Sequence, residues 1–242
     1  MKERLHTEVA QANRILAHLG ILDGYGHVSA RLPGHASRFL ISRSLAPALV
    51  TVDDLMELDL DGNPVGNDLR KPYLERFIHA EIYRARPDVS AIVHSHAPSV
   101  VPFSVSSVRL RPVCHMSGFL GAGAPVFDIR HRFGCTDMLV RNGEQGAELA
   151  GQLGKNAAAL MRGHGFVVVG SSVPEAVFRA VYTEWNARLQ REAIQLAGEI
   201  TYLTEEEASL AEAANAATVE RPWQLWLQEC GLDNEQAPRK SP

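Results

Sequence analysis

The sequence lacks the features of membrane and secreted proteins. No apolar run approaches the about 20 residues that a membrane-spanning helix needs. The first ten residues, MKERLHTEVA, are polar and contain no signal-peptide hydrophobic region. The three cysteines, Cys114, Cys135 and Cys230, are widely spaced and form no C-x-x-C pair, which suits a reducing compartment. We therefore expect a cytoplasmic protein with no membrane partner.

An excess of positive charge is also missing. The formal net charge of the 242 residues is −4, which argues against a nucleic-acid partner. There is no internal repeat and no low-complexity linker, so the length is consistent with one domain. We expect a catalytic domain over residues 1–220 and a C-terminal segment with a polar tail over 221–242. Trp223 and Trp226 in that segment pack either on their own domain or on a neighbouring subunit.

Hydrophobic periodicity predicts an alternation of helices and short strands. Strands are expected over 27–32, 38–42, 55–60, 90–93, 108–113, 124–129 and 166–169, and helices over 5–19, 72–86, 97–103, 144–153, 173–197 and from 205. The glycine-rich stretch 117–124 lacks the G-x-G-x-x-G spacing and the lysine of phosphate-binding loops. The order of elements gives no indication of a βαβ nucleotide-binding fold.

Two histidines stand two residues apart where a predicted buried strand ends. His94 and His96 follow the apolar run 90–93, and residues i and i+2 of a strand project from the same face. Two imidazoles that converge in this way form half of a metal site. The alternative is a pair that only caps a strand, because a bare His-x-His spacing is a weak signal.

His164 offers the missing third imidazole. It stands between Gly163 and Gly165 at a junction of apolar runs, where a turn can aim one ring inward. Three imidazoles with an open position describe a catalytic metal site, with zinc as the default. Manganese or cobalt would better tolerate the oxygen ligands of a chelating substrate. Glu75, in the first turn of the helix predicted from Pro72, is either an acid favoured by the helix dipole or part of this site.

Four motifs in order resemble the class II aldolase/adducin family over roughly residues 5–200. They are G-x-x-S-A-R at 26–31, K-P-x-x-E at 71–75, H-S-H-A-P at 94–98 and R-G-H-G at 162–165. The resemblance implies an α/β/α single domain with a central, mainly antiparallel sheet. It implies one divalent metal ion per subunit on His94, His96 and His164, with Glu75 as the acid/base beside it. It also implies a homotetramer with the site at a subunit interface.

The sequence departs from the phosphate-binding residues of the family's sugar-phosphate enzymes. His27 stands where those enzymes have Asn, the second loop reads Ser42-Arg43-Ser44, and Tyr73 and Leu74 replace two serines. Leu74 cannot donate a hydrogen bond, and a buried polar atom left unpaired costs about 2–7 kcal/mol. A guanidinium suits a carboxylate, and an aromatic ring suits a flat substrate.

These departures favour the family branch that decarboxylates hydroxylated ring acids, such as dihydroxyphthalate. We therefore predict a metal-dependent decarboxylase of a hydroxylated aromatic or pyridine carboxylic acid, which would serve the catabolism of aromatic compounds. The alternatives are an aldolase or epimerase of a small sugar or sugar phosphate, and a non-catalytic adducin-like interaction domain. The candidate substrate-binding residues are Arg43, His27, Ser42, Ser44 and Tyr73, with His115 as a weaker candidate.

Overall fold

The computed structural model describes residues 2–233, and the predicted polar tail lies almost entirely outside them. Its centre is a seven-stranded sheet in the order β3-β2-β1-β4-β7-β6-β5. Every neighbouring pair is antiparallel except β5 and β6. The strands are β1 (His27–Arg31), β2 (Arg38–Ser42), β3 (Leu55–Asp59), β4 (Ala91–Ser95), β5 (Val126–Phe127), β6 (Ala158–Met161) and β7 (Gly165–Gly170).

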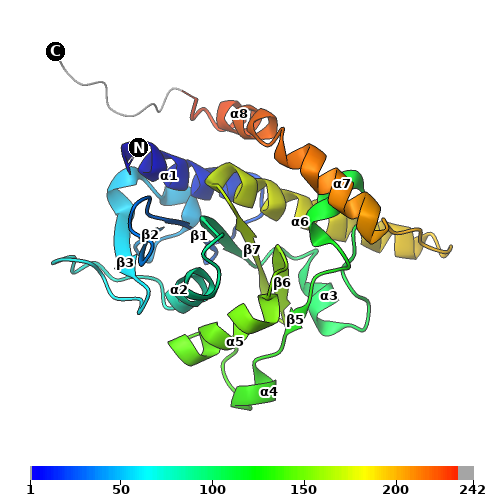
Figure 1. Ribbon diagram of the computed structural model, residues 1–242, viewed down its shortest axis with the longest axis horizontal. Helices are drawn as coiled ribbons and strands as arrows, with labels where there is room; N and C mark the ends of the chain where they lie inside the picture. The colour runs from blue at the N-terminus through cyan, green and yellow to red at the C-terminus, as the bar shows by residue number, and fades with distance from the viewer. Residues whose placement is uncertain (1, 234–242) are drawn as a thin grey trace.

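Helices cover both faces of this sheet (Figure 1). They are α1 (Lys2–His18), α2 (Arg76–Ala85), α3 (Val101–Val105), α4 (Arg130–Phe133), α5 (Gly143–Leu153), α6 (Val173–Gln195), α7 (Glu205–Ala216) and α8 (Glu220–Glu229). Short 3-10 turns occupy Pro47–Leu49, Val52–Asp54 and His115–Leu120.

Alternation along the strands divides the core into two apolar layers. In β7, Phe166 and Val168 pack in the layer of α1, α6 and α8, whereas Val167 and Val169 pack in the layer of α2 and α5. Each fully buried side chain of this size contributes about 1.5–3 kcal/mol relative to exposure. A sheet buried on both faces in this way confirms the predicted α/β/α class with a mainly antiparallel sheet.

Two capping signals in the sequence correctly mark the starts of helices. Ser172 accepts a hydrogen bond from the Glu175 N–H at the start of α6. Thr204 and Glu207 form the reciprocal capping box that begins α7.

In α8, Trp223 and Trp226 are buried in the same apolar layer as α1, so both rings pack within their own chain.

Three predicted elements are wrong in detail. Residues 108–113 form no strand, because their backbone groups bond to the side chains of Asn186 and Gln190 on α6 instead of to a neighbouring strand. Helix α2 begins at Arg76 and not at Pro72, since Pro72 forms a bridge with Arg43 beside β2. Glu75 is therefore the residue that precedes the helix. The short helix expected over 97–103 starts later, at Val101.

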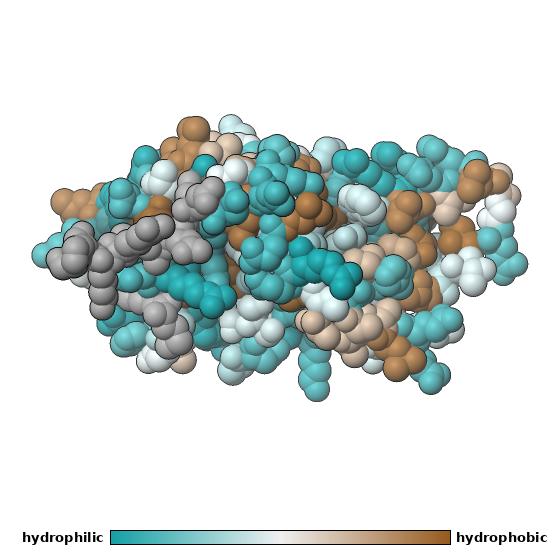
Figure 2. Space-filling view, turned by 90° about the horizontal axis from the view of Figure 1, so that it is seen from above, coloured by the Kyte–Doolittle hydropathy of each residue, from teal (hydrophilic) through white to brown (hydrophobic). Residues whose placement is uncertain are grey.

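Hydrophilic and hydrophobic residues are interspersed on the surface, as Figure 2 shows for the face over α1 and α6–α8. Within residues 2–233, no helix is both long and apolar enough to cross a membrane. The three cysteines are unpaired.

Candidate metal centre

The centre lies where β4 ends against the beginning of α2. His94 has the same strand parity as Ile92, which packs in the layer of α2 and α5, so its ring faces α2. His96 follows the strand end two residues later. Glu75 immediately precedes α2 and is buried, with 8% of its surface exposed. The sheet and one helix thus bring three of the predicted site residues together.

The turn between β6 and β7 supplies His164. Gly163 adopts a left-handed φ of 63°, which only glycine takes up readily. A Cβ on Gly165 would lie 2.1 Å from the Ser95 carbonyl oxygen, so only glycine allows β7 to start this close to β4. The two glycines that flank His164 therefore permit a close approach of two strands, which places the ring beside His94.

Glu75, His94, His96 and His164 form a tight cluster. Their potential ligand atoms all lie within 4.8 Å of one another. The Nε2 atoms of His94 and His96 are 3.0 Å apart. Glu75 Oε2 is 3.4 Å from His164 Nε2 and 3.8 Å from His94 Nε2. This set of donors can hold a divalent metal ion.

Each of the three histidines has an acceptor on its other ring nitrogen. The Nδ1 of His94 lies 3.0 Å from the Phe166 carbonyl oxygen, and that of His164 lies 3.1 Å from the Met138 carbonyl oxygen. His96 Nδ1 lies 3.1 Å from a carboxylate oxygen of Asp23. Carbonyls and carboxylates only accept, so Nδ1 is the donor in each ring and the Nε2 lone pair is left for a metal. The donor set fits a metal ion.

The charges of the cluster are consistent with that role. Burial, reinforced by the neighbouring His164, holds the pKa of His94 well below its ordinary value, so this ring is neutral. Burial also acts to lower the pKa of His164, but the hydrogen bond and negative charge of Glu75 outweigh it and raise the pKa. Glu75 Oε1 accepts the Val140 N–H at 2.9 Å, which leaves Oε2 directed at the histidines.

Asp23 is a candidate site residue that the sequence did not reveal, since its carboxylate lies against His96. It lies in the turn before β1, where Oδ1 also accepts the N–H groups of Tyr25 and Gly26. Burial raises its pKa, but these hydrogen bonds and the nearby His96 lower it below the usual range. The sequence signal was the run Asp23-Gly24-Tyr25-Gly26, which is equally typical of an ordinary turn.

His27 lies against the metal cluster, on the same face of the sheet. Its ring centroid is 5.1 Å from that of His94 and 4.6 Å from that of Tyr73. Tyr73 donates its hydroxyl to the Leu45 carbonyl and accepts a hydrogen bond from Ser42 at 3.1 Å. Ser42, Tyr73 and His27 therefore form a continuous buried band that ends at the candidate metal ligand His94.

The other predicted substrate residues lie further along this band or elsewhere. Arg43 follows Ser42 and donates from Nε to Asp54 at 2.7 Å, with its side chain 41% exposed. Ser44 is exposed beside it. His115 is exposed at the start of a 3-10 turn, where its carbonyl accepts from Asn215 of α7. The structure therefore brings His27, but not His115, to the centre.

Comparison with known proteins identifies the family. Residues 7–191 match the family described as Class II Aldolase and Adducin N-terminal domain. The chain belongs to this family.

The relatives of this class II aldolase-family chain include named decarboxylases. Decarboxylase tropJ of Talaromyces stipitatus is 40% identical over 238 residues, which cover 89% of this chain and 90% of that protein. The 3,4-dihydroxyphthalate decarboxylase of Arthrobacter keyseri is 30% identical over 231 residues, which cover 89% of each protein. The resemblance to the family and to its aromatic acid decarboxylase branch is thus confirmed.

A solved structure supports the fold of this class II aldolase-family chain. An aldolase II superfamily protein from Pseudomonas syringae superposes with a TM-score of 0.79 at 24% identity. The match covers 98% of this chain and 95% of that one. At this identity the likeness establishes the fold alone.

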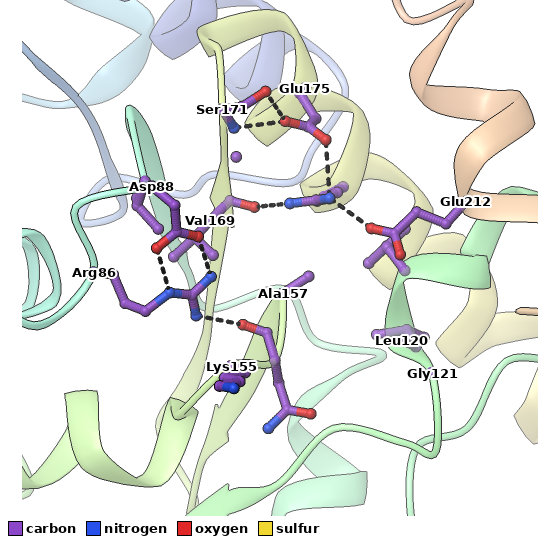
Figure 3. A pocket seen from close by; sticks show the side chains of 15 residues that line it. Arg86, Asp88, Leu120, Gly121, Lys155, Ala157, Val169, Ser171, Glu175 and Glu212 are labelled. Atoms are coloured by element: carbon purple, nitrogen blue, oxygen red, sulfur yellow. Dashed lines mark hydrogen bonds and ion pairs between the residues drawn. The ribbon is translucent and has the colours of Figure 1, made fainter. Parts of the chain in front are cut away.

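A large cavity of about 460 Å³ in this class II aldolase-family chain lies away from the metal centre (Figure 3). It is lined by Gly170, at the end of β7 opposite to His164. Arg86 pairs with Asp88 at 2.7 Å, and Arg179 bonds to Glu175 and Glu212. With Lys155, which also lines the cavity, the three basic and three acidic side chains balance, so the cavity offers no strong site for a charged ligand.

Proposed function

We propose that this protein is a divalent-metal-dependent decarboxylase of a hydroxylated aromatic or pyridine carboxylic acid. The observation that carries the proposal is the cluster of three Nε2 atoms with the Glu75 carboxylate, each histidine already oriented through Nδ1. The decarboxylase names of relatives with 40% and 30% identity support this reaction class.

His94, His96 and His164 would hold one divalent ion, Zn²⁺ or Mn²⁺, with Co²⁺ as a further option. When bound, the ion would supply Lewis-acid stabilisation of negative charge on substrate oxygens. The neutral imidazoles leave its positive charge uncompensated by the protein, except through Glu75 and, at one remove, Asp23.

Glu75 is the proposed acid/base. Decarboxylation breaks the bond between a ring carbon and a carboxylate, carbon dioxide leaves, and the bonding electron pair stays on the ring carbon. Glu75, protonated or through a water molecule, then delivers a proton to that carbon. The Val140 N–H holds Oε1, so Oε2 is the atom that carries the proton into the site.

Arg43 and His27 are the proposed partners of a second substrate carboxylate. Among the described residues Arg43 bonds to Asp54 through Nε alone, which leaves its two terminal amino groups for a bidentate contact. Tyr73 packs against the His27 ring and accepts a hydrogen bond from Ser42. Ser44 lies next to Arg43 at the surface. These residues would favour a flat acid over a sugar phosphate.

The test is carbon dioxide release from the Zn²⁺- or Mn²⁺-loaded protein with a panel of hydroxylated benzene and pyridine dicarboxylates, including 3,4-dihydroxyphthalate. We expect turnover that a chelator abolishes and added metal restores. Glu75→Gln, which keeps the size of the side chain, should lower kcat about 10²–10⁴-fold because the proton donor is lost.

Absence of turnover across the panel would contradict the proposal. Release of an aldehyde from a ulose phosphate would instead establish the aldolase alternative. Native protein purified without bound metal would favour the adducin-like interaction role.

A homotetramer with the site at a subunit interface and a cytoplasmic location remain predictions. Exposed apolar side chains on and just after the second half of α6, such as Trp185 and Leu196, support self-association. Sedimentation equilibrium of the metal-loaded protein tests the oligomer, and a monomer at micromolar concentration would contradict it.

A further inference from the structure

Four buried side chains form a hydrogen-bonded chain that leads away from the metal centre. His27 Nδ1 lies 2.6 Å from His79 Nε2, and His79 Nδ1 lies 2.6 Å from Ser29 Oγ. Ser29 Oγ in turn lies 2.8 Å from the Tyr83 hydroxyl. None of the four residues is more than 2% exposed. His27 and Ser29 project from one face of β1, and His79 and Tyr83 stand one turn apart on α2.

The last member determines the direction in which these hydrogen bonds run. Among the described residues, Ser29 Oγ is the only partner of the Tyr83 hydroxyl. If Tyr83 accepted from Ser29, its own hydrogen would be buried without an acceptor, which costs about 1–3 kcal/mol. Tyr83 therefore donates to Ser29.

The remaining bonds follow from this start. Ser29 receives the Tyr83 hydrogen and donates its own to His79 Nδ1, so His79 carries its single proton on Nε2. That N–H donates to His27 Nδ1. Burial, which lowers the pKa of His79 to about 3, keeps this imidazole neutral with one donor and one acceptor. His27 is left with its proton on Nε2.

The Nε2 atom of His27 is the free end of the chain. It has no hydrogen-bond partner among the described residues. Unlike the fully buried unpaired atoms, it keeps some exposure to solvent. Its ring packs against that of the metal ligand His94. The free N–H is therefore close to the candidate metal centre and open to solvent.

We propose that the chain Tyr83–Ser29–His79 locks His27 in the Nε2–H tautomer and makes it a neutral hydrogen-bond donor to an anionic oxygen of the substrate. This deepens the proposed function, on which it rests, because it assigns His27 to a carboxylate or phenolate oxygen. His79, Ser29 and Tyr83 are positioning residues that act through His27. A ring locked the other way would present a lone pair and repel the same oxygen.

The tautomer can be measured directly without any substrate. Nitrogen-15 NMR of the zinc-loaded full chain, labelled at histidine and assigned with His27→Gln, distinguishes a protonated from an unprotonated Nε2. We expect His27 to carry its proton on Nε2 alone. A proton on Nδ1, or on both nitrogens, would overturn the proposal whether or not the protein is a decarboxylase.

Two variants test the role of the chain. Ser29→Ala removes the donor to His79 Nδ1, so we expect the His27 signal to shift toward a mixture of both tautomers. Ser117→Ala is the matched control, because it removes the hydroxyl of a buried serine that bonds to the Tyr182 carbonyl and lies outside this chain, so the Nε2–H form should persist. An unchanged tautomer in Ser29→Ala would contradict the role of the chain.

The donor role is tested with phthalate, an unreactive aromatic dicarboxylate, by titration calorimetry of the zinc-loaded protein. His27→Leu should weaken binding about 10- to 100-fold, the effect of losing one hydrogen bond to a charged group. His27→Gln, which retains an N–H donor, should lose less. Equal losses in both variants would show that His27 fills space only and would overturn the donor role. Zinc content measured on each variant separates loss of metal from loss of phthalate.

Discussion

At the residue scale, the candidate metal centre depends on groups outside the proposed ligand set. Asp23 orients His96 through Nδ1, as the Phe166 and Met138 carbonyls orient the other two rings. A carboxylate in this position also raises the basicity of the ligand ring. Of these three groups only Asp23 is a side chain, so it is the only one that a substitution can change directly.

Asp23→Asn is expected to weaken metal binding about 10- to 100-fold. Asparagine keeps an oxygen for the Tyr25 and Gly26 N–H groups, so the turn is retained and the charge is what is lost. The measurement is competition for zinc with a chromophoric chelator. Asp61→Asn, an exposed carboxylate paired with Arg84, is the control and should match the wild type. Equal zinc affinity in all three proteins would exclude Asp23 from the site.

Asp128, which pairs with Arg162, is expected to contribute to stability in a pH-dependent way. A hydrogen bond from Arg130 holds its pKa well below the usual range against the effect of burial, with a further contribution from Arg162. A pKa that is depressed in the folded state stabilises above the unfolded value of about 3.9 and loses this effect as the pH falls toward the folded value.

Asp128→Asn should therefore lower the free energy of unfolding more at pH 7 than at pH 3. Urea unfolding at the two pH values measures the difference. Asp137→Asn, in an exposed pair with Arg141, should cost little at either pH. A loss for Asp128→Asn that is the same at both pH values would show that its charge is not the cause.

At the scale of elements, helix α6 organises a segment that has no regular structure. Asn186 accepts from the Val113 N–H at 2.9 Å and donates to the Arg111 carbonyl at 2.7 Å. Gln190 makes the same pair of bonds one turn later, to Arg111 and Arg109. Two amides one turn apart thus serve as a neighbouring strand for the extended segment 109–113.

Asn186→Leu is expected to destabilise the protein by about 2–4 kcal/mol, because it leaves a backbone N–H and a carbonyl without partners. Denaturant unfolding gives the value. Gln195→Leu changes an exposed amide on the same helix and should stay within about 0.5 kcal/mol of the wild type. A small effect of Asn186→Leu would mean that water replaces these bonds.

At the scale of the whole molecule, a bound metal would join segments that are distant in the sequence. The proposed ligands come from the end of β4, the residues just after it and the β6–β7 turn, and Glu75 immediately precedes α2. An ion that binds only the folded state at about 100 times its Kd stabilises by about 2.7 kcal/mol.

Removal of the metal should therefore lower Tm by about 5–10 °C for a chain of this size. Calorimetry with and without chelator, followed by re-addition of zinc, measures the shift. His164→Ala should show little zinc-dependent shift, and a wild-type Tm unaffected by chelator would contradict a resident metal.

Much of this architecture could be predicted from the sequence because the signals are local. Strand alternation, the Ser172 and Thr204 caps and the four motifs depend only on nearby residues, and they sufficed for the fold class and for the set Glu75, His94, His96 and His164. The predicted strand over 108–113 failed because its partner is a pair of side chains about 75 residues away, which no local pattern reveals.

The sequence by itself determined which side chains are candidate ligands and that both faces of the sheet are buried. Both follow from residue chemistry and from the periodicity of apolar residues. Only the tertiary structure decided which ring nitrogen each histidine presents, because that depends on acceptors such as Asp23 and the Met138 carbonyl, which are distant in sequence. It likewise decided that His27 ends a buried chain through His79, Ser29 and Tyr83, which β1 and α2 bring into contact.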